Sequence, residues 1–345
     1  MFDVITIGGA TLDFFVESSK FNILDFKSID SHKELLCMGY GDKIEIEQSS
    51  FDIGGGAVNT SVSFAKLGLN TSLLAKTGAG HIANYLLSKV RSRNVDTSLV
   101  VKSRVDRTGF SIILTSFEGD RTVLTQRGAN STLVKDEINC EALKGTKAIY
   151  CSSLSNNSEK ILADIAGFCH QNSIKFACNP GGTTIKKGMD IQLEFLSHTN
   201  ILILNKHEAS DFTGIIEKTE SKYDEISESS INPDIQKMLI TLKKFVKDIV
   251  VITDGKKGVY VYDGLKFYSA NPYPAKVVST LGAGDAFAST FVGTMIKTDD
   301  IQKAIALALI NSASVVGEYG AQTGLKTYDE LLEIYSKANI EICVL

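Results

Sequence analysis

The sequence predicts an α/β fold in which helices cover both faces of a mainly parallel sheet. Short apolar runs alternate with segments of helical hydrophobic period along most of the 345 residues. Strand, helix and strand in succession are typical of such sheets. The apolar fraction, 43%, is ordinary for a globular protein and sufficient for a sizeable core. Two segments interrupt the alternation and predict a second, smaller β structure.

The alternation assigns strands and helices in chain order. Strands are expected at Val4–Ile7, Ser72–Ala75, Ala148–Ser152, Lys175–Cys178, Ile201–Leu204 and Ile249–Thr253. Helices are expected at Ala57–Leu67, Ile82–Arg93, Glu159–Gln171, Asp234–Val246, Asp285–Lys297, Ile301–Glu318 and Tyr328–Ala338. Ligands of parallel sheets bind beyond the carboxyl ends of the strands, so we expect the functional residues to gather there.

The segments that interrupt the alternation are about 13–51 and 105–128. The second has strand residues on both sides of Glu118-Gly119-Asp120, which is typical of a hairpin. We expect the two segments to form a small β lid within one domain spanning 1–345, and the alternative is ordinary edge strands. The polar, acidic segment 217–233 is expected to be a solvated surface insertion.

Charge, cysteines and the N-terminus narrow the class of protein. The net charge is −4 with the two signs interspersed, so nothing favours a nucleic-acid partner. The six cysteines form no CxxC pair, and Cys151 and Cys178 lie in strand-like runs, which indicates reduced core residues of a cytoplasmic protein. The N-terminus is typical of a first strand rather than a signal peptide, and no apolar stretch reaches the roughly 18 residues of a membrane span.

The most informative motif is Gly282-Ala283-Gly284-Asp285, a glycine turn that opens into a helical segment. The first turn of a helix has unpaired N–H groups and a positive dipole end, which together make an anion site. A carboxylate there is poorly suited to holding a phosphate but well suited to taking a proton from a hydroxyl that attacks one. The motif therefore indicates phosphoryl transfer to an alcohol, and the alternative is an ordinary capped helix.

Two motifs could hold an alcohol. Gly54 and Gly55 precede a helix whose first turn carries Asn59, which could hydrogen-bond hydroxyls. Asp13 follows the first strand closely, and an ionised carboxylate accepts from two hydroxyls, although an exposed turn acid is an equal reading. A nicotinamide site is disfavoured, because the glycines are contiguous and lie far downstream of the first strand.

Two further motifs follow predicted strands. Asn205 and Glu208 have the spacing of a helix capping box, and they could also organise a hydrated Mg²⁺ near nucleotide phosphates. Thr253, Gly255 and Gly258 could let a nucleotide lie against the backbone, although for this motif taken alone a plain hairpin is the better explanation. The P-loop and the protein-kinase motifs are missing from the sequence.

With these residues in hand, the chain resembles the ribokinase-like (PfkB) family of carbohydrate and nucleoside kinases. The match runs nearly end to end in the family's order. It covers Gly8-Gly9 with Asp13, Gly54-Gly55 with Asn59, Lys76-Thr77-Gly78, Asn94 to Ser98, Thr108-Gly109, Asn179-Pro180, Asn205 to Glu208, Thr253 to Gly258, Gly282 to Asp285, and Gly320-Ala321.

The resemblance implies a three-layer α/β/α domain with a β lid, ATP as donor and Mg²⁺ as helper. It implies that Asp285 is the catalytic base, that Gly282, Ala283 and Gly284 complete the catalytic motif, and that the N–H groups around Ala283, Gly284 and Asp285 form an anion hole. The implied acceptor residues are Asp13, Gly54, Gly55 and Asn59, the implied nucleotide residues are Asn205, Thr253, Gly255, Gly258 and Asn311, and the implied metal residue is Glu208.

One departure concerns a monovalent cation. The family usually has an Asp three residues before the first glycine of the Gly-Ala-Gly-Asp signature, where it helps to bind that cation, and this chain has Ser279. The substitution puts potassium activation in doubt. The family also sometimes dimerises through its lid, and the sequence does not decide whether this chain does.

The substrate hypothesis is a small sugar, with an adenosine-type nucleoside as the first alternative. Arg104, Arg107, Arg121 and Arg127 in or beside the lid could serve a phosphosugar. The candidates for an apolar slot that holds a base are Phe14, Phe15, Phe110 and Phe117, although each could equally be ordinary packing. A hypothesis of another class is a sugar sensor without catalysis. Retention of Asp285 argues against it, because a binder needs no base there.

Overall fold

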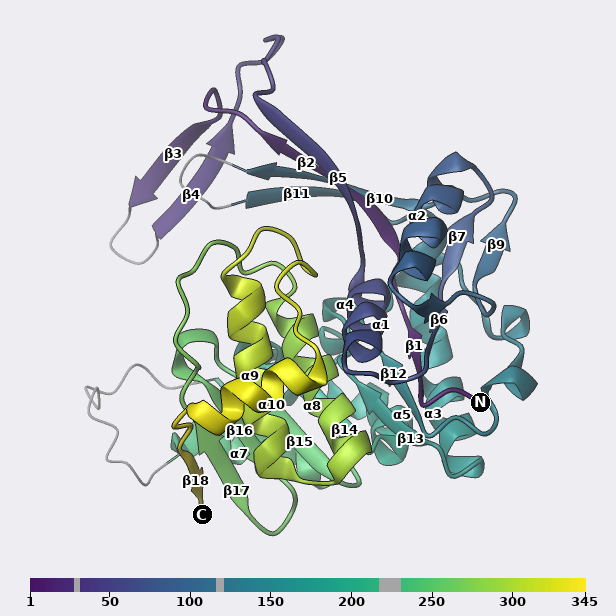
Figure 1. Cartoon of the computed structure of the whole chain (residues 1–345), viewed down its shortest axis with the longest axis vertical. Coiled ribbons are helices and arrows are strands. Elements are labelled where there is room, and N and C mark those ends of the chain that lie inside the picture. The colour runs from purple at the N-terminus through teal and green to yellow at the C-terminus, as the bar shows by residue number, and fades with distance from the viewer. Residues whose placement is uncertain (28–31, 116–120, 217–230) are drawn as a thin grey trace.

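The large sheet has ten strands and is parallel over most of its width (Figure 1). The computed structural model describes residues 1–27, 32–115, 121–216 and 231–345. The parallel strands are, in spatial order, β15 (Ile249–Thr253), β14 (Ile201–Asn205), β13 (Lys175–Cys178), β12 (Ala148–Cys151), β1 (Val4–Ile7), β6 (Thr71–Leu74) and β8 (Val95–Asp96). The predicted mainly parallel sheet is confirmed.

Antiparallel strands extend this sheet beyond β15. They are β16 (Val259–Tyr262), β17 (Phe267–Ala270) and β18 (Ile342–Val344). The sequence pattern predicts the β15–β16 hairpin but misses the last two strands. Their antiparallel pairing in the folded chain identifies them as strands.

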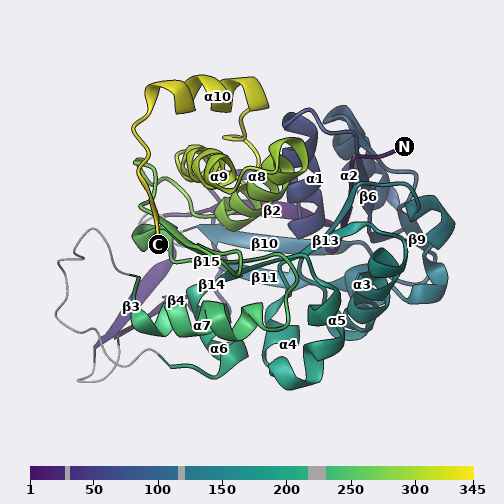
Figure 2. The ribbon, with the colours of Figure 1, turned by 90° about the horizontal axis from the view of Figure 1, so that it is seen from below.

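Helices form a layer on each face of the large sheet (Figure 2). One layer holds α1 (Gly56–Lys66), α8 (Ala283–Thr298), α9 (Ile301–Val316) and α10 (Tyr328–Lys337), with α2 (His81–Ser92) beside α1. The other holds α3 (Ile161–Gln171), α4 (Gly182–Ile185), α5 (Leu193–His198), α6 (Lys206–Thr213) and α7 (Pro233–Lys243). The predicted helices agree with these bounds to within two residues, except that α7 ends before Val246.

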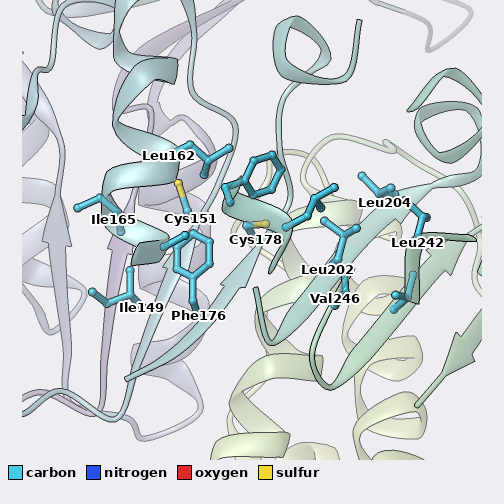
Figure 3. Close-up of a cluster of buried hydrophobic side chains, with 14 of the residues drawn as sticks. Ile149, Cys151, Leu162, Ile165, Phe176, Cys178, Leu202, Leu204, Leu242 and Val246 are labelled. Carbon is cyan, nitrogen blue, oxygen red and sulfur yellow. The ribbon is translucent and has the colours of Figure 1, made fainter. Parts of the chain in front are cut away.

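The core lies on both faces of the sheet because successive strand side chains alternate. In β1, Ile5 and Ile7 join the cluster on the α3–α7 side, whereas Val4 joins the cluster on the α8–α9 side. Figure 3 shows part of the first cluster, with Cys151 and Cys178 packed among aliphatic side chains. Burying one such aliphatic side chain contributes about 1.5–3 kcal/mol, so the two clusters are the main source of stability.

Cys151 and Cys178 are core residues, as predicted, and Cys169 is buried with them. All six cysteines lie in the described part of the chain and are free thiols, and the other three are partly exposed. Burial raises the pKa of the Cys178 thiol to about 12, which keeps it protonated and unreactive.

A second sheet of four strands stands apart from the large one (Figure 1). Its order is β11 (Arg121–Gln126), β10 (Gly109–Thr115), β2 (Thr11–Glu17) and β5 (Gln48–Gly54). The alternative of edge strands of the main sheet is therefore wrong, since these strands pair with one another. We call this four-stranded sheet the lid sheet. The hairpin β3 (Asn22–Lys27) and β4 (His32–Cys37) extends beyond it, and β7 (Lys76–Gly78) pairs with β9 (Val101–Ser103).

Two predicted features fall on residues outside the described ranges: the turn Glu118-Gly119-Asp120 and most of the acidic segment 217–233. Among the helices that the structure describes, none has the length and apolar character needed to cross a membrane.

Candidate active site

The glycine turn before α8 has the backbone that the sequence predicts for an anion site. Gly282 lies in the left-handed region at φ +78°, and a Cβ there would lie 2.5 Å from the Cβ of Ala321. The hydroxyl of Ser312 on α9 donates to the Ala283 carbonyl at 3.1 Å. A Cβ at Gly284 would meet nothing within 4 Å. Ala283 N donates to the Thr280 carbonyl at 3.4 Å, whereas no backbone hydrogen bond is described for the N–H groups of Gly284 and Asp285, which are therefore the open donors of this tightly held turn.

Asp285 is the carboxylate at this helix start, and α1 supplies its partner. The Nδ2 of Asn59 donates to Oδ2 of Asp285 at 2.8 Å. Burial raises the pKa of Asp285 to about 6, although the hydrogen bond from Asn59 opposes the rise. A carboxylate with such a pKa is mostly ionised at neutral pH and is a stronger base than an exposed Asp, as proton abstraction requires.

The glycines before α1 allow the end of β5 to lie close to the end of β1 and to β2. Gly55 has φ +92°, and a Cβ there would lie 2.5 Å from the backbone oxygen of Gly9. A Cβ at Gly54 would collide with Oδ2 of Asp13. The two glycines thus bring the acceptor motifs of the sequence, at the ends of β1 and β5, into one place.

Asp13 lies on β2 of the lid sheet, opposite Asp52 on β5 and Ser111 on β10. Burial raises its pKa, hydrogen bonds from Thr11 and Ser111 lower it, and the charge of Asp52 raises it. Its Oδ1 is buried without a hydrogen-bond partner among the described residues. Such an acceptor is costly unless a ligand supplies the donor.

The nucleotide motifs lie together at the carboxyl ends of β14 and β15. Asn205 pairs with Thr253 across these strands, and Asn205 and Glu208 form the predicted capping box of α6. Gly258 has φ +90°, and a Cβ there would collide with the Ala270 carbonyl. Gly255 is also left-handed, at φ +51°. These glycines keep the β15–β16 turn tight, as either a plain hairpin or a nucleotide surface requires.

A buried tyrosine of β12 links the two halves of the site. The pKa of Tyr150 is raised by burial first, and the charges of Asp285 and Glu208 raise it further. Both carboxylates therefore act on the same buried phenol, as expected for residues gathered at one end of the sheet.

Glu208 is the candidate metal residue. Both of its described side-chain hydrogen bonds use Oε2, from Asn205 N at 2.9 Å and Asn179 Nδ2 at 3.4 Å, which leaves Oε1 for a water or cation. Burial raises its pKa, so a cation nearby would favour the ionised form. Among the described residues, no group of three or more His, Cys, Asp or Glu could hold a metal. The fit is to a hydrated Mg²⁺ shared with phosphates.

Asn311 is the one predicted site residue that the structure places behind the site. It is fully buried on α9, donates to Thr290 Oγ1 at 2.8 Å and accepts from Lys326 N at 3.0 Å. Its neighbour Ser312 holds the Ala283 carbonyl. Asn311 therefore braces the helix pair under the anion turn instead of facing a ligand.

Sequence reasoning missed three residues near Asp285: Arg93, Gln322 and Asp52. Gln322 donates to Asn59 Oδ1 at 2.9 Å, and Arg93 donates to Gln322 Oε1 at 2.8 Å. Gln322 directly follows the Gly320-Ala321 motif, which was a usable signal. Arg93 and Asp52 carry no such signal, because only the folded chain brings them to the site.

The fold and the site define a ribokinase-like α/β protein with an anion turn, a buried base beside it and a separate lid sheet. The family described as pfkB family carbohydrate kinase matches residues 25–328 of the chain. The chain belongs to this family and is an ATP-dependent phosphotransferase, which confirms the resemblance seen in the sequence and rejects the nicotinamide alternative.

Individual relatives agree with this family. A ribokinase of Staphylococcus aureus is 24% identical over 301 residues, which cover 85% of this chain and 92% of the relative. A nucleoside kinase of Methanocaldococcus jannaschii is 25% identical over 298 residues, covering 86% and 90%. The structure of Arabidopsis thaliana ribokinase complexed with ribose and ATP superposes with a TM-score of 0.78 at 19% identity, covering 97% of this chain and 98% of that one.

Proposed function

We propose that this enzyme transfers the terminal phosphoryl group of ATP to a hydroxyl of a small sugar. The observation that carries the proposal is the pairing of Asp285 with the first turn of α8. A base whose pKa is raised to about 6 lies where helix N–H groups can hold a phosphoryl group.

The residues divide the work of the reaction. Asp13 Oδ1, which has no partner among the described residues, accepts a hydrogen bond from one hydroxyl of the sugar. Asn59 hydrogen-bonds a second hydroxyl of the sugar beside Asp285. Asp285 takes the proton of the attacking hydroxyl. The N–H groups of Gly284 and Asp285 stabilise the charge on the moving phosphoryl group, each by about 3 kcal/mol, and that of Ala283 joins them when its 3.4 Å hydrogen bond to the Thr280 carbonyl is released.

The nucleotide is assigned to the other half of the site, with Asn205, Thr253, Gly255 and Gly258 along its path. The likeness to a ribokinase solved with ATP supports this assignment. Mg²⁺, held through Glu208 and water, would neutralise phosphate charge. We place no monovalent cation at Ser279, since its Oγ accepts from Leu281 N at 3.3 Å and so closes the local turn.

The lid sheet belongs to the same proposal. We assign the whole chain to one kinase domain whose lid, about 13–51 and 105–128, closes over the acceptor and excludes water. A homodimer through the lid would cover its exposed apolar side chains, among them Phe51 and Leu124, each 53% exposed. Six free thiols fit a cytoplasmic enzyme.

The second candidate acceptor is a nucleoside, which one relative's name supports. Phe14, expected as part of a base slot, stacks on Phe51 with ring centroids 4.5 Å apart. This pair spans β2 and β5, so a base would have to stack on its outer face or displace it. Arg104, Arg107 and Arg127 are exposed, and the side chain of Arg121 lies outside the description. None of these contacts favours a phosphosugar.

The test is ADP release from Mg·ATP across pentoses, hexoses, their phosphates and nucleosides, each with sodium or potassium. We expect one sugar to exceed the other acceptors in kcat/KM, with equal rates in the two salts. A preferred nucleoside would replace the sugar assignment, and potassium activation would contradict the assignment of Ser279. A protein that binds ATP but releases no ADP with any acceptor would favour the sensor hypothesis.

A further inference from the structure

A chain of hydrogen bonds connects the partly buried arginine Arg93 to Asp285. Arg93, at the end of α2, donates to Gln322 Oε1 at 2.8 Å, and Gln322 Nε2 donates to Asn59 Oδ1 at 2.9 Å. Asn59 Nδ2 then donates to Asp285 Oδ2 at 2.8 Å. The chain joins α2, the segment before α10, α1 and α8, and Figure 1 shows α2 beside α1.

The direction of this chain is set by its ends. A guanidinium has only donors, so Gln322 must present its oxygen to Arg93. The Gln322 nitrogen then faces inward, where it also donates to the Ile53 carbonyl, a group that can only accept, at 2.9 Å. Asn59 must therefore present its oxygen to Gln322 and its nitrogen to Asp285. Each amide has one orientation that satisfies every partner.

Because the two amides are buried, turning either of them over would cost a hydrogen bond that water cannot replace. The Gln322 and Asn59 side chains are 3% and 7% exposed, so water cannot replace a lost partner. Arg93 is anchored at the other end by Asp52, with 3.7 Å between guanidinium and carboxylate. The titratable group coupled to Asp285 from the sheet beneath is Tyr150, which burial keeps neutral.

We propose that Gln322 and Arg93 are positioning residues that hold the Asn59 amide with its N–H group toward Asp285. The inference rests on the proposed function, in which Asp285 is the base. A donor aimed at the carboxylate favours its ionised form, and it also fixes which oxygen stays open to the acceptor hydroxyl. If the Asn59 amide turned over, its carbonyl would face Asp285 and favour the protonated, inactive acid.

The test compares Gln322→Met with Gln322→Glu through the pH dependence of kcat/KM for the acceptor, which reports the free enzyme. Gln322→Met removes the hydrogen bonds of Gln322 to both Arg93 and Asn59. It should move the acid limb of the kcat/KM profile to higher pH by about one unit. Gln322→Glu keeps an acceptor for Arg93, now as an ion pair in place of the hydrogen bond to the amide, but offers Asn59 only acceptors, so it should move the limb further. The terminal phosphate of ATP also titrates near pH ~6, but it is common to all variants.

Ser314→Ala is the matched control. Ser314 Oγ donates to the Gly324 carbonyl at 2.7 Å and so holds the same segment as Gln322. It takes no part in the series of hydrogen bonds from Arg93 to Asp285. Its acid limb should coincide with that of the wild type. A shift equal to that of Gln322→Met would mean that general loosening of the segment is responsible, and would overturn the inference.

Asp285→Asn separates this inference from the proposed function. We expect it to lose turnover by about 10²–10⁴-fold while still binding ATP. If it does, and both folded Gln322 variants keep the acid limb of the wild type, the positioning role of Gln322 and Arg93 is wrong and the assignment of Asp285 as the base stands. If Asp285→Asn turns over nearly normally, the assignment of Asp285 as the base fails, and the positioning role of Gln322 and Arg93 fails with it.

Discussion

At the scale of single residues, two carboxylates with raised pKa values do different work. Asp285 has a donor on one oxygen and faces the anion turn, which suits a base. Asp13 has a buried oxygen without a described partner and lies on the lid sheet, which suits recognition of a hydroxyl. Burial is the largest cause of both shifts, and the neighbours decide the roles.

The raised pKa of Asp285 predicts an acid limb in the activity. Because the base must be ionised, kcat/KM should be level at neutral pH and fall about tenfold per unit below about pH 6. A limb near 4 would mean that Asp285 titrates like an exposed Asp and would contradict its burial.

The same shift has a consequence for stability. The pKa of Asp285 is raised from 3.8 to about 6 on folding, so the native protein binds this proton more tightly than the unfolded chain. Its contribution to the free energy of unfolding is fully present below 3.8 and is lost as the pH rises through about 6. Asp285→Asn, which cannot ionise, should therefore gain stability relative to the wild type between about pH 4 and pH 7, as denaturant unfolding at both ends would measure.

At the scale of elements, the start of α8 depends on two glycines used differently. Gly282 needs its left-handed backbone and its close approach to Ala321, whereas Gly284 is helical and faces open space. The sequence shows both as glycines of one motif, and only the backbone separates their roles.

Gly282→Ala and Gly284→Ala should therefore have different effects on stability and on kinetics. Gly282→Ala should lose about 1–3 kcal/mol of stability and most turnover, because the left-handed backbone is strained with a Cβ and the turn must shift. Gly284→Ala should keep or gain stability, about 0.5–1 kcal/mol for alanine in a helix, yet raise KM for ATP by crowding the phosphoryl position. Thermal unfolding and steady-state kinetics measure both. Normal kinetics in Gly284→Ala would remove Gly284 from the phosphoryl site.

At the scale of the whole molecule, the position of the lid sheet over the large sheet decides whether an acceptor can be enclosed. Asn130, in the 3₁₀ turn Gly128–Ser131 after β11, accepts from Ala10 N at 2.9 Å and donates to Ala10 O at 3.0 Å. Ala10 is the last of the three residues between the end of β1 and the start of β2. One side chain thus joins two of the points where the lid sheet meets the body.

Asn130→Ala should loosen this junction. We expect KM for the acceptor to rise while KM for ATP stays near normal, with a stability loss of about 1–3 kcal/mol from two lost backbone contacts. Asn200→Ala is the control, because Asn200 Oδ1 accepts from Phe176 N at 2.9 Å far from the lid sheet. It should lose comparable stability without a change in either KM. Equal kinetic effects in both variants would show that general destabilisation is the cause.

Local patterns predicted the features that depend on neighbours in the chain. The strands and helices follow from hydrophobic period, and the turns at Gly55 and Gly282 follow from glycine before a helical segment, because these signals lie within about ten residues. Asp285 and Asn59 were recognisable for the same reason, since each occupies the first turn of its own helix.

The tertiary structure alone decided what depends on residues far apart in the sequence. Each hydrogen bond of the series from Arg93 through Gln322 and Asn59 to Asp285 joins residues more than 200 positions apart, so no local pattern relates them. Asn311 is a polar residue of the kind found in binding sites, but packing directs its side-chain amide toward Thr290 instead of toward the nucleotide half of the site. Hydrophobic period determines which face of an element is buried, whereas the partner on that face, and hence the orientation of each amide and the pKa of each carboxylate, is set by the close packing of the folded chain.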